Sequence, residues 1–463
     1  MDDMWLKVFD PKLPDSEPWI GKISLEDDQK SRWQFELIRS LDGMSESYAP
    51  ITYFNESQSL TGLLDLQRDC TLIRPMVTNL NPGSFGVYQV GHRTKLNGQF
   101  QALLENAAVK DLDAPRVLGV SIASDSFASW YAKISRSEIE NQTSSPMGNY
   151  EEEIISIQGL GKVTCRYGFS KSMTTWEDKE KSYSAFNIDF DHKISVNDSM
   201  VWCFELECLF QFLVGLSTKW SKFSLKMDET YQSGSDTHHY FSELTFSKTP
   251  YKNLERPHPF ECAHNNRRCS ADLEQILNCY VEDRKNLAER IQAIRYARLM
   301  ANSLQEKFTT TLPVLEAYLT KTYQNYDEVS FLESKKAFFD WVEKSDNSDV
   351  LDFSKKHIKV ADAKAPSLKN LILRAMESVN SEGYKFSENL SDKITKRRGR
   401  VFHNNLTIDD HDDGMNFRAE VFTIIGLLAL HTYRDLGLDI SKLESGRSGN
   451  QEIQWFFKPP APA

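Results

Sequence analysis

The sequence lacks several features that would assign the protein to a class directly. No apolar run reaches the roughly 20 residues needed to cross a bilayer. The two most apolar stretches are residues 200–216 and 421–430. The first contains Glu205 and Glu207 and the second is only ten residues long, so each predicts a buried helix and not a membrane span. The first residues carry neither a basic nor an apolar segment. We therefore expect no secretory signal, no membrane contact and a cytoplasmic location.

Basic residues are also in short supply. With 55 Lys and Arg against 66 Asp and Glu, the 463-residue chain has a formal net charge of -11. Non-specific coating of nucleic acid needs many Lys or Arg contacts to phosphates, so any nucleic-acid contact must come from a local basic patch. The seven cysteines form an odd set without the spacing of a disulfide framework, as expected of reduced thiols.

Motifs of the common hydrolases are absent too. The chain has no G-x-S-x-G and no H-E-x-x-H sequence. Gly159-Leu-Gly-Lys162 lacks both the earlier glycine and the following Ser or Thr of a phosphate loop. Serine hydrolase, zincin and P-loop chemistry are therefore without support.

Hydrophobic patterning in the first half is typical of strands. Apolar and polar residues alternate there over short stretches, as they do in half-buried strands. The expected strands are residues 21–25, 32–38, 154–157, 163–169, 184–190 and 220–227. The Asn97-Gly98 dipeptide tolerates the backbone of a type I′ turn and predicts a hairpin between residues 87–95 and 99–104. One helix is expected from Asp198-Ser199, good N-cap residues, to Gly215.

From about Ser270 onward the pattern changes to that of helices. Apolar residues recur at intervals of three and four, the spacing of one helix face. The expected helices are residues 273–280, 287–299, 312–326, 331–344, 368–379 and 417–436. The predicted fold class is α+β with two domains. It has a β-rich domain at 1–250, a linker at 251–283, an all-α domain at 284–445 and a tail at 446–463.

Four side chains that can bind metal lie within twelve residues of the predicted linker: His258, Cys262, His264 and Cys269. Thiolate and imidazole are ligands that Zn²⁺ prefers, which favours a structural zinc site. The paired C-x2-C spacing of common zinc modules is absent, so a linker with reduced thiols is the competing interpretation. Measurement of bound metal distinguishes the two.

The most basic stretch of the chain is Lys396-Arg-Arg-Gly-Arg-Val-Phe-His-Asn-Asn-Leu406. Such a cluster on a helical segment is most often a solvated face. Arg398 and His403, with four residues between them, also combine a phosphate-binding guanidinium with a side chain that exchanges a proton near neutral pH. The acidic run at residues 409–413 either pairs with this patch or forms a solvated loop.

Together with its helical surroundings, the basic stretch resembles the Arg-x4-6-His signature of the HEPN superfamily. The similarity is to the ApeA-like HEPN domains of bacterial abortive-infection and anti-phage proteins, and it spans about residues 285–440. It includes the Leu315-Glu-Ala-Tyr318 element and the apolar last helix at residues 422–438. The first half is similar, more weakly, to the β-rich domain that precedes HEPN in ApeA-type proteins, notably at Phe210–Thr218.

Two registers fit the signature, because Arg397 precedes His403 with five residues between them and Arg398 with four. Gly399 stands where family members commonly have Asn, Asp or His after the motif arginine. We favour Arg398, and assign Arg397 and Arg400 to phosphate-binding support. On a continuous helix Arg398 and His403 lie on different faces. A bend at Gly399, which costs a helix about 1 kcal/mol relative to alanine, would bring them together.

The resemblance implies a metal-independent endoribonuclease that forms a homodimer or a higher homo-oligomer and requires no cofactor. His403 would act as acid and base, and Arg398 would stabilise the phosphoryl charge as a ribose 2′-hydroxyl attacks the adjacent phosphate. The products would be 2′,3′-cyclic phosphate and 5′-hydroxyl ends. Asn404 would orient the imidazole or the phosphate, and Glu316 would align an arginine or the histidine. A helix cap and a structural salt bridge are equally good interpretations of these two residues.

By the same resemblance, the protein would act in anti-phage defence. It would cleave RNA, with transfer RNA as the first candidate, in response to a phage-encoded trigger. The competing hypothesis is a catalytically inactive HEPN helical module that serves as a binding or regulatory protein. Cleavage of RNA by the purified protein separates the two.

Overall fold

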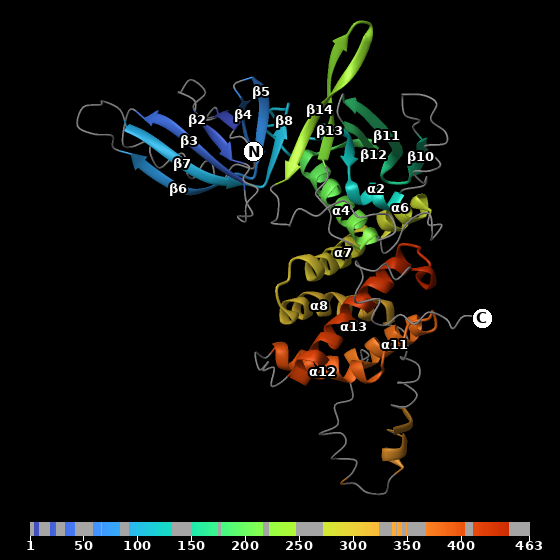
Figure 1. Ribbon diagram of the computed structural model, residues 1–463. Helices are drawn as coiled ribbons and strands as arrows, with labels where there is room; N and C mark the ends of the chain where they lie inside the picture. The colour runs from blue at the N-terminus through green and yellow to red at the C-terminus, as the bar shows by residue number, and fades with distance from the viewer. Residues whose placement is uncertain are drawn as a thin grey trace. The chain divides into compact units, whose positions relative to one another are not determined.

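A computed structural model gives the architecture of the chain (Figure 1). The residues that it describes are 4–8, 19–24, 33–41, 59–65, 67–83, 92–131, 151–174, 177–215, 222–246, 272–323, 336–338, 340–344, 349, 367–402 and 411–443. The chain divides into two compact units, a sheet unit of residues 1–282 and a helical unit of residues 283–463. The expectation of an α+β chain, strands first and helices after, is confirmed.

The described strands of the sheet unit form one antiparallel sheet of 14 strands. Their order is β10-β11-β12-β9-β13-β14-β8-β5-β4-β1-β2-β3-β7-β6. The bounds of the first eight are β1 Met4–Val8, β2 Trp19–Ser24, β3 Trp33–Leu41, β4 Ser59–Leu64, β5 Arg68–Ile73, β6 Met76–Gly83, β7 His92–Phe100 and β8 Ala102–Glu105. The other six are β9 Val117–Ala123, β10 Glu151–Ile157, β11 Gly161–Thr174, β12 Glu177–Ile194, β13 Lys222–Ser233 and β14 Asp236–Phe246.

The sheet consists of two blocks of strands that are each continuous in the sequence. Strands β1–β8 form one block and β9–β14 the other. Among the described strands, the two blocks are joined by the pairing of β14 with β8, over four residue pairs from Glu243 opposite Glu105 to Phe246 opposite Ala102. One core cluster belongs to the first block and includes Leu6, Trp19 and Phe35.

Most of the predicted strands are present, and β2 pairs with β3 as expected. The hairpin predicted at Asn97-Gly98 is wrong, because both residues lie inside β7. Strand β7 pairs with β3 on one side and with β6 on the other. The register with β6 shifts between Val77 and Asn79, opposite this dipeptide. The dipeptide therefore lies beside a bulge, a second setting that suits residues with a permissive backbone.

The sheet unit also carries helices α2 (Asp125–Tyr131), α4 (Val196–Val214) and α6 (Leu273–Glu282). Helix α4 begins after Ser195, whose hydroxyl accepts a hydrogen bond from the Asp198 amide at 2.9 Å. It ends at Gly215, whose φ of 74° is the left-handed C-cap conformation. The predicted helix is confirmed, with its start three residues earlier. Helix α6 lies within the range interpreted as a linker and belongs to the sheet unit.

Two acids interrupt the apolar run of α4, and each has a structural use. Glu207 is fully buried and accepts hydrogen bonds from the Ser124 hydroxyl at 3.0 Å and the Gln211 amide at 2.9 Å. Glu205 accepts a hydrogen bond from the Tyr280 hydroxyl of α6 at 3.3 Å. A buried carboxylate needs such donors, and the two hydrogen bonds to Glu207 allow this acid to lie in the interior of the sheet unit, while Glu205 is only partly buried.

The helical unit contains α7 (Arg284–Leu299), α8 (Leu304–Tyr323), α11 (Leu368–Asn380), α12 (Asn389–Phe402), α13 (His411–Asp435) and the short helix η3 (Ile440–Lys442). Helix α13 is central, because it contacts α7, α8, α11 and α12. Residues 421–430 are all buried, which explains their apolar sequence without a bilayer. In the part of the chain that the structure describes, no helix is long and apolar enough to span a membrane.

Candidate functional site

Helix α12 carries two neighbouring arginines in opposite environments. The Arg397 side chain is only 5% exposed and binds two carboxylates of α13. Its Nε lies 3.0 Å from Glu420 Oε2, and its Nη1 and Nη2 lie 3.1 and 2.6 Å from the two oxygens of Asp413. Its guanidinium carbon lies 5.0 Å from the centre of the Phe417 ring. The donors of Arg397 are thus committed to contacts inside the protein.

The two carboxylates that bind Arg397 respond to it differently. Hydrogen bonding to Arg397 lowers the pKa of Asp413, which is partly exposed. Glu420 is only 2% exposed, and its burial raises its pKa despite the hydrogen bonds from Arg397. The hydrogen bonding that Arg397 donates to Asp413 is the main cause that raises the pKa of Arg397 itself. Arg397 therefore remains a cation that joins α12 to α13.

Arg398 lies on the exposed side of the same helix. Its side chain is 47% exposed, and it pairs with Glu316 of α8, which is 33% exposed. Arg398 Nε lies 3.1 Å from Glu316 Oε2, and Nη2 lies 3.3 Å from Oε1, a two-pronged contact. The exposed Phe402 ring lies 5.8 Å from the guanidinium carbon. Two residues predicted for the site, Arg398 and Glu316, are thus in direct contact.

The other predicted residues are distributed as follows. Arg400 is exposed at the end of α12, and its charge contributes to the lowered pKa of Asp413. Helix α12 continues through Gly399 to Phe402. His403 and Asn404 follow Phe402 directly in the sequence and lie outside the described residues. The approach of His403 to Arg398 therefore stays a prediction from the sequence.

The proposed zinc ligands His258, Cys262, His264 and Cys269 also lie outside the described residues, in the stretch 247–271. Among the residues that the structure does describe, no group of three or more His, Cys, Asp or Glu side chains is placed to hold a metal ion. The zinc site thus stays a prediction from the sequence.

Two contributors to this region, Phe417 and Glu420, were not singled out in the sequence. With Asp413 they recur at intervals of four and three along α13, so they share one helix face. Asp413 belongs to the acidic run that was expected either to pair with the basic patch or to be solvated, and it pairs with Arg397. The spacing of 413, 417 and 420 is the signal that could have found this face.

The architecture defines an α+β protein in which a large antiparallel sheet precedes a helical unit with an Arg-rich helix end. A family model described as ApeA N-terminal domain 1 matches residues 22–280, more than half of the chain. The chain therefore belongs to the ApeA N-terminal domain 1 family, and the resemblance of its first half to ApeA-type proteins is confirmed. A search of curated proteins and a search of solved structures found no match.

Proposed function

We propose that this chain is an ApeA-type defence protein whose helical unit is a HEPN-type, metal-independent endoribonuclease. The observation that carries the proposal is the exposed Arg398 in the C-terminal half of α12, paired in a two-pronged contact with Glu316. An exposed guanidinium can exchange a carboxylate for a phosphate, since both present oxygens that match its planar set of donors. Membership of the ApeA N-terminal domain family supports the defence role.

The environments of the two arginines favour Arg398 over Arg397 as the arginine of the signature. Arg397 would have to abandon two carboxylates, one of them deeply buried, before it could bind a phosphate. We therefore assign Arg397 to positioning. It fixes α12 to α13 on either side of residues 403–410, a stretch that includes His403.

In the proposed reaction, His403 removes the proton of a ribose 2′-hydroxyl as its oxygen forms a bond to the adjacent phosphorus. The bond from phosphorus to the 5′-oxygen breaks, and the His403 imidazolium returns the proton to the leaving 5′-oxygen. Arg398 stabilises the negative charge on the phosphoryl oxygens. The ends formed are a 2′,3′-cyclic phosphate and a 5′-hydroxyl.

Glu316 has a specific part in this scheme. Its carboxylate accepts hydrogen bonds from Nε and Nη2 of Arg398 and so orients the guanidinium. The same contact neutralises the guanidinium, so an incoming phosphate competes with Glu316. Arg400 supplies a further exposed cation on the same helix, and Asn404 orients the imidazole or the phosphate.

The proposed assembly is a homodimer in which residues of two protomers share one cleft. The substrate is RNA, with transfer RNA as the first candidate, and a phage-encoded component is the trigger. The sheet unit would restrain the nuclease or sense this trigger. These assignments follow from the resemblance of the helical unit to HEPN domains.

The test is cleavage of total RNA by the purified full chain, followed by sequencing of 5′-hydroxyl ends. Variants Arg398→Ala and His403→Ala should each reduce the rate at least ~100-fold, as expected for loss of a charge stabiliser or an acid-base group. Lys396→Ala is the matched control. It removes an exposed cation from the same helix, and the carboxylate partner of Lys396 is Asp392, not Glu316. It should cleave at the wild-type rate.

The outcomes separate the two classes of function. Cleavage that persists unchanged in both the Arg398 and the His403 variants would exclude this site. Wild-type protein that binds RNA or another partner but never cleaves, with or without phage infection of the expressing cells, would identify a binding or regulatory module instead.

A further inference from the structure

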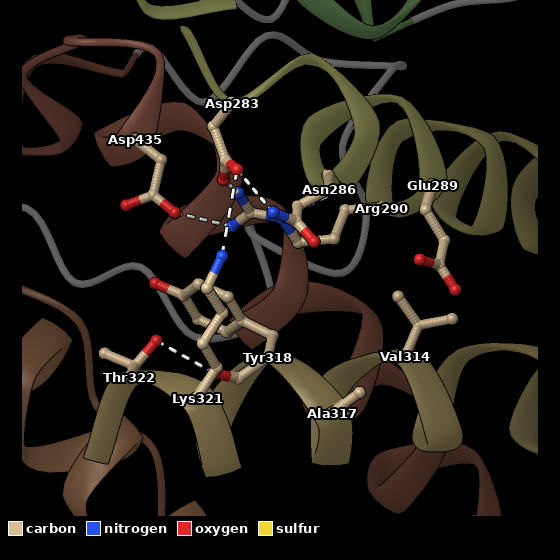
Figure 2. Close-up of a pocket in the computed structure, with 10 residues that line it drawn as sticks. All are labelled: Asp283, Asn286, Glu289, Arg290, Val314, Ala317, Tyr318, Lys321, Thr322 and Asp435. Atoms are coloured by element: carbon tan, nitrogen blue, oxygen red, sulfur yellow. Dashed lines mark hydrogen bonds and ion pairs between the residues drawn. The ribbon is translucent and has the colours of Figure 1, made fainter. Parts of the chain in front are cut away.

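The helical unit contains a pocket of about 310 Å³ on a different face of α8 from Glu316. The pocket is lined by Asp283, the residue before α7, and by Asn286, Glu289 and Arg290 of α7. Helix α8 contributes Val314, Ala317, Tyr318, Lys321 and Thr322, and the end of α13 contributes Asp435. Figure 2 shows these side chains, with Glu289 and Val314 on one side of the pocket and Asp435 and Thr322 on the other. This volume accommodates an amino-acid side chain with its adjoining backbone, at the small end of the range for ligand sites.

Arg290 is the most unusual member of this pocket, because it is charged and only 2% exposed. Its Nη1 donates to Asp435 Oδ2 at 2.6 Å, and its guanidinium carbon lies 4.4 Å from the centre of the Tyr318 ring. Its Nη2 is 3.8 Å from Asp283 Oδ2, too far for a hydrogen bond. Among the described residues, Nη2 has no hydrogen-bond acceptor. A buried donor in this state points to an acceptor supplied from outside.

The charge of the pocket limits what that acceptor can be. Three carboxylates, Asp283, Glu289 and Asp435, stand against two cations, Arg290 and Lys321, which leaves one net negative charge. Burial raises the pKa of Tyr318 to about 12, and burial lowers the pKa of the neighbouring His431 to about 4, so both are neutral at ordinary pH. An anionic ligand would add charge beside Asp283 and Asp435. A neutral carbonyl oxygen satisfies Arg290 Nη2 without that cost.

The side of the pocket that contains Glu289 favours a cationic ligand group. Glu289 is exposed and, among the described residues, has no ion pair or hydrogen bond. Val314 and Ala317 of α8 provide a short apolar wall next to it (Figure 2). An aliphatic stem that ends in an ammonium or guanidinium group fits a wall of this kind followed by a carboxylate.

We propose that this pocket binds a basic residue of a partner polypeptide, with the cationic head on Glu289 and a backbone carbonyl on Arg290. A free basic amino acid presents a carboxylate in place of the neutral carbonyl, and a nucleotide presents a phosphate, so both are disfavoured by the carboxylates of the pocket. Lys321 is 68% exposed with its Nζ 3.8 Å from Asp283, and it must swing aside for the carbonyl to reach Arg290. The proposal does not depend on ribonuclease activity.

The experiment is ligand-observed saturation-transfer NMR on the full chain. The probes are N-acetyl-arginine N-methylamide, the norleucine analogue without a cation, free L-arginine and guanosine monophosphate. The arginine amide should bind about tenfold more tightly than each of the other three. Its affinity should fall as salt is raised, because the contact with Glu289 is exposed.

Two variants locate the binding, and one serves as the control. Ala317→Trp fills the pocket from an exposed position and should abolish the signal, while Glu289→Gln should weaken binding about fivefold. Glu377→Gln removes an exposed carboxylate of α11 outside the pocket and should leave binding unchanged. Thermal unfolding of each variant establishes that it is folded.

Each contrary result overturns a defined part of the proposal. No binding of the arginine amide, or equal binding of the norleucine analogue, excludes a basic residue as the ligand. Equal or tighter binding of free arginine or the nucleotide refutes the argument from charge. Unchanged binding in both Ala317→Trp and Glu289→Gln places the ligand elsewhere.

Discussion

Helix α12 forms an arginine–carboxylate ion pair on its buried side and another on its exposed side, and the two pairs serve different purposes. Arg397 and Arg398 are adjacent in the sequence, each meets carboxylates on another helix, and each makes a two-pronged contact. The contacts of Arg397 are enclosed between α12 and α13, whereas the contact of Arg398 with Glu316 is open to water. The two arginines therefore differ mainly in burial, at 5% and 47% exposure of the side chain.

This difference teaches how a site can be assigned from two identical side chains. Water screens an exposed pair and can replace either partner, so the pair contributes little to stability and can open for a substrate. A buried pair cannot lose one partner without leaving the other charged and unsolvated. The exposed arginine is therefore available for binding, and the buried one is committed to the fold.

The largest expected effect is on the buried side. Arg397→Met should lower the free energy of unfolding of the helical unit by about 3–5 kcal/mol, because Glu420 and Asp413 lose their cation. Urea unfolding followed by circular dichroism measures this, with Lys396→Ala as the exposed control. A loss below ~1 kcal/mol would mean that the two sides of the helix do not differ as described.

The pH dependence of stability should report the same cluster. The pKa of Asp413 is lowered in the folded protein, so its stabilising contribution is complete above its ordinary pKa near ~4 and is lost as the pH falls through the lowered value. Burial raises the pKa of Glu420, so its ionisation opposes folding as the pH rises above about 4.

Asp413→Asn should therefore be less stable than wild type near neutral pH and lose less stability on acidification below about pH 4. Urea midpoints across this range provide the comparison. Glu377→Gln, an exposed change on α11, should retain the wild-type profile. A profile for Asp413→Asn that runs parallel to wild type would count against the Arg397 contact.

Gly399→Ala should change the free energy of unfolding by less than Arg397→Met does, and in the opposite direction. The glycine is inside α12, and a Cβ there would meet no atom within 4 Å among the described residues. Alanine should stabilise the helical unit by about 0.5–1 kcal/mol, because glycine loses more backbone entropy in a helix. A loss of stability would indicate that the helix end needs the freedom of glycine. RNA cleavage by the same variant tests whether that freedom matters for the proposed site.

The smallest effect on stability belongs to the exposed side. Arg398→Ala and Glu316→Gln should each change the free energy of unfolding by no more than about 0.5 kcal/mol, and a double-mutant cycle should give a coupling of similar size. The same urea experiment measures it. A coupling above ~2 kcal/mol would make this pair structural and would remove the distinction from Arg397.

Local sequence patterns predicted elements with strong periodicity and failed where partners distant in the chain decide the structure. The sequence predicted helix α4 from its apolar run, the end of α4 at Gly215, and the buried helix α13. The dipeptide Asn97-Gly98 predicts a turn when only its local sequence is considered. In the structure Gly98 pairs with Val77 and Phe35, which are distant in the sequence. Local propensity cannot register such pairing.

The candidate site shows the same limit. The sequence identified the basic cluster and the contact partner Glu316, yet it assigned Arg397 and Arg398 together to phosphate. Their separation depends on which side of α12 meets α13, and that follows from the positions of Asp413, Phe417 and Glu420. Adjacent residues on a helix point about 100° apart, so equal composition does not give equal exposure.

The junction between β8 and β14 sets an order for the making of the sheet unit. The described strands of the first block all come from residues 4–105, and among them β8 lacks its β14 neighbour until β14 has been synthesised and has emerged from the ribosome. The four-residue pairing of β14 with β8, which joins segments far apart in the sequence, must then form, and contacts of this kind form slowly in folding. Until it does, the unpaired edge of β8 is available to other chains, including a second copy of the same nascent protein.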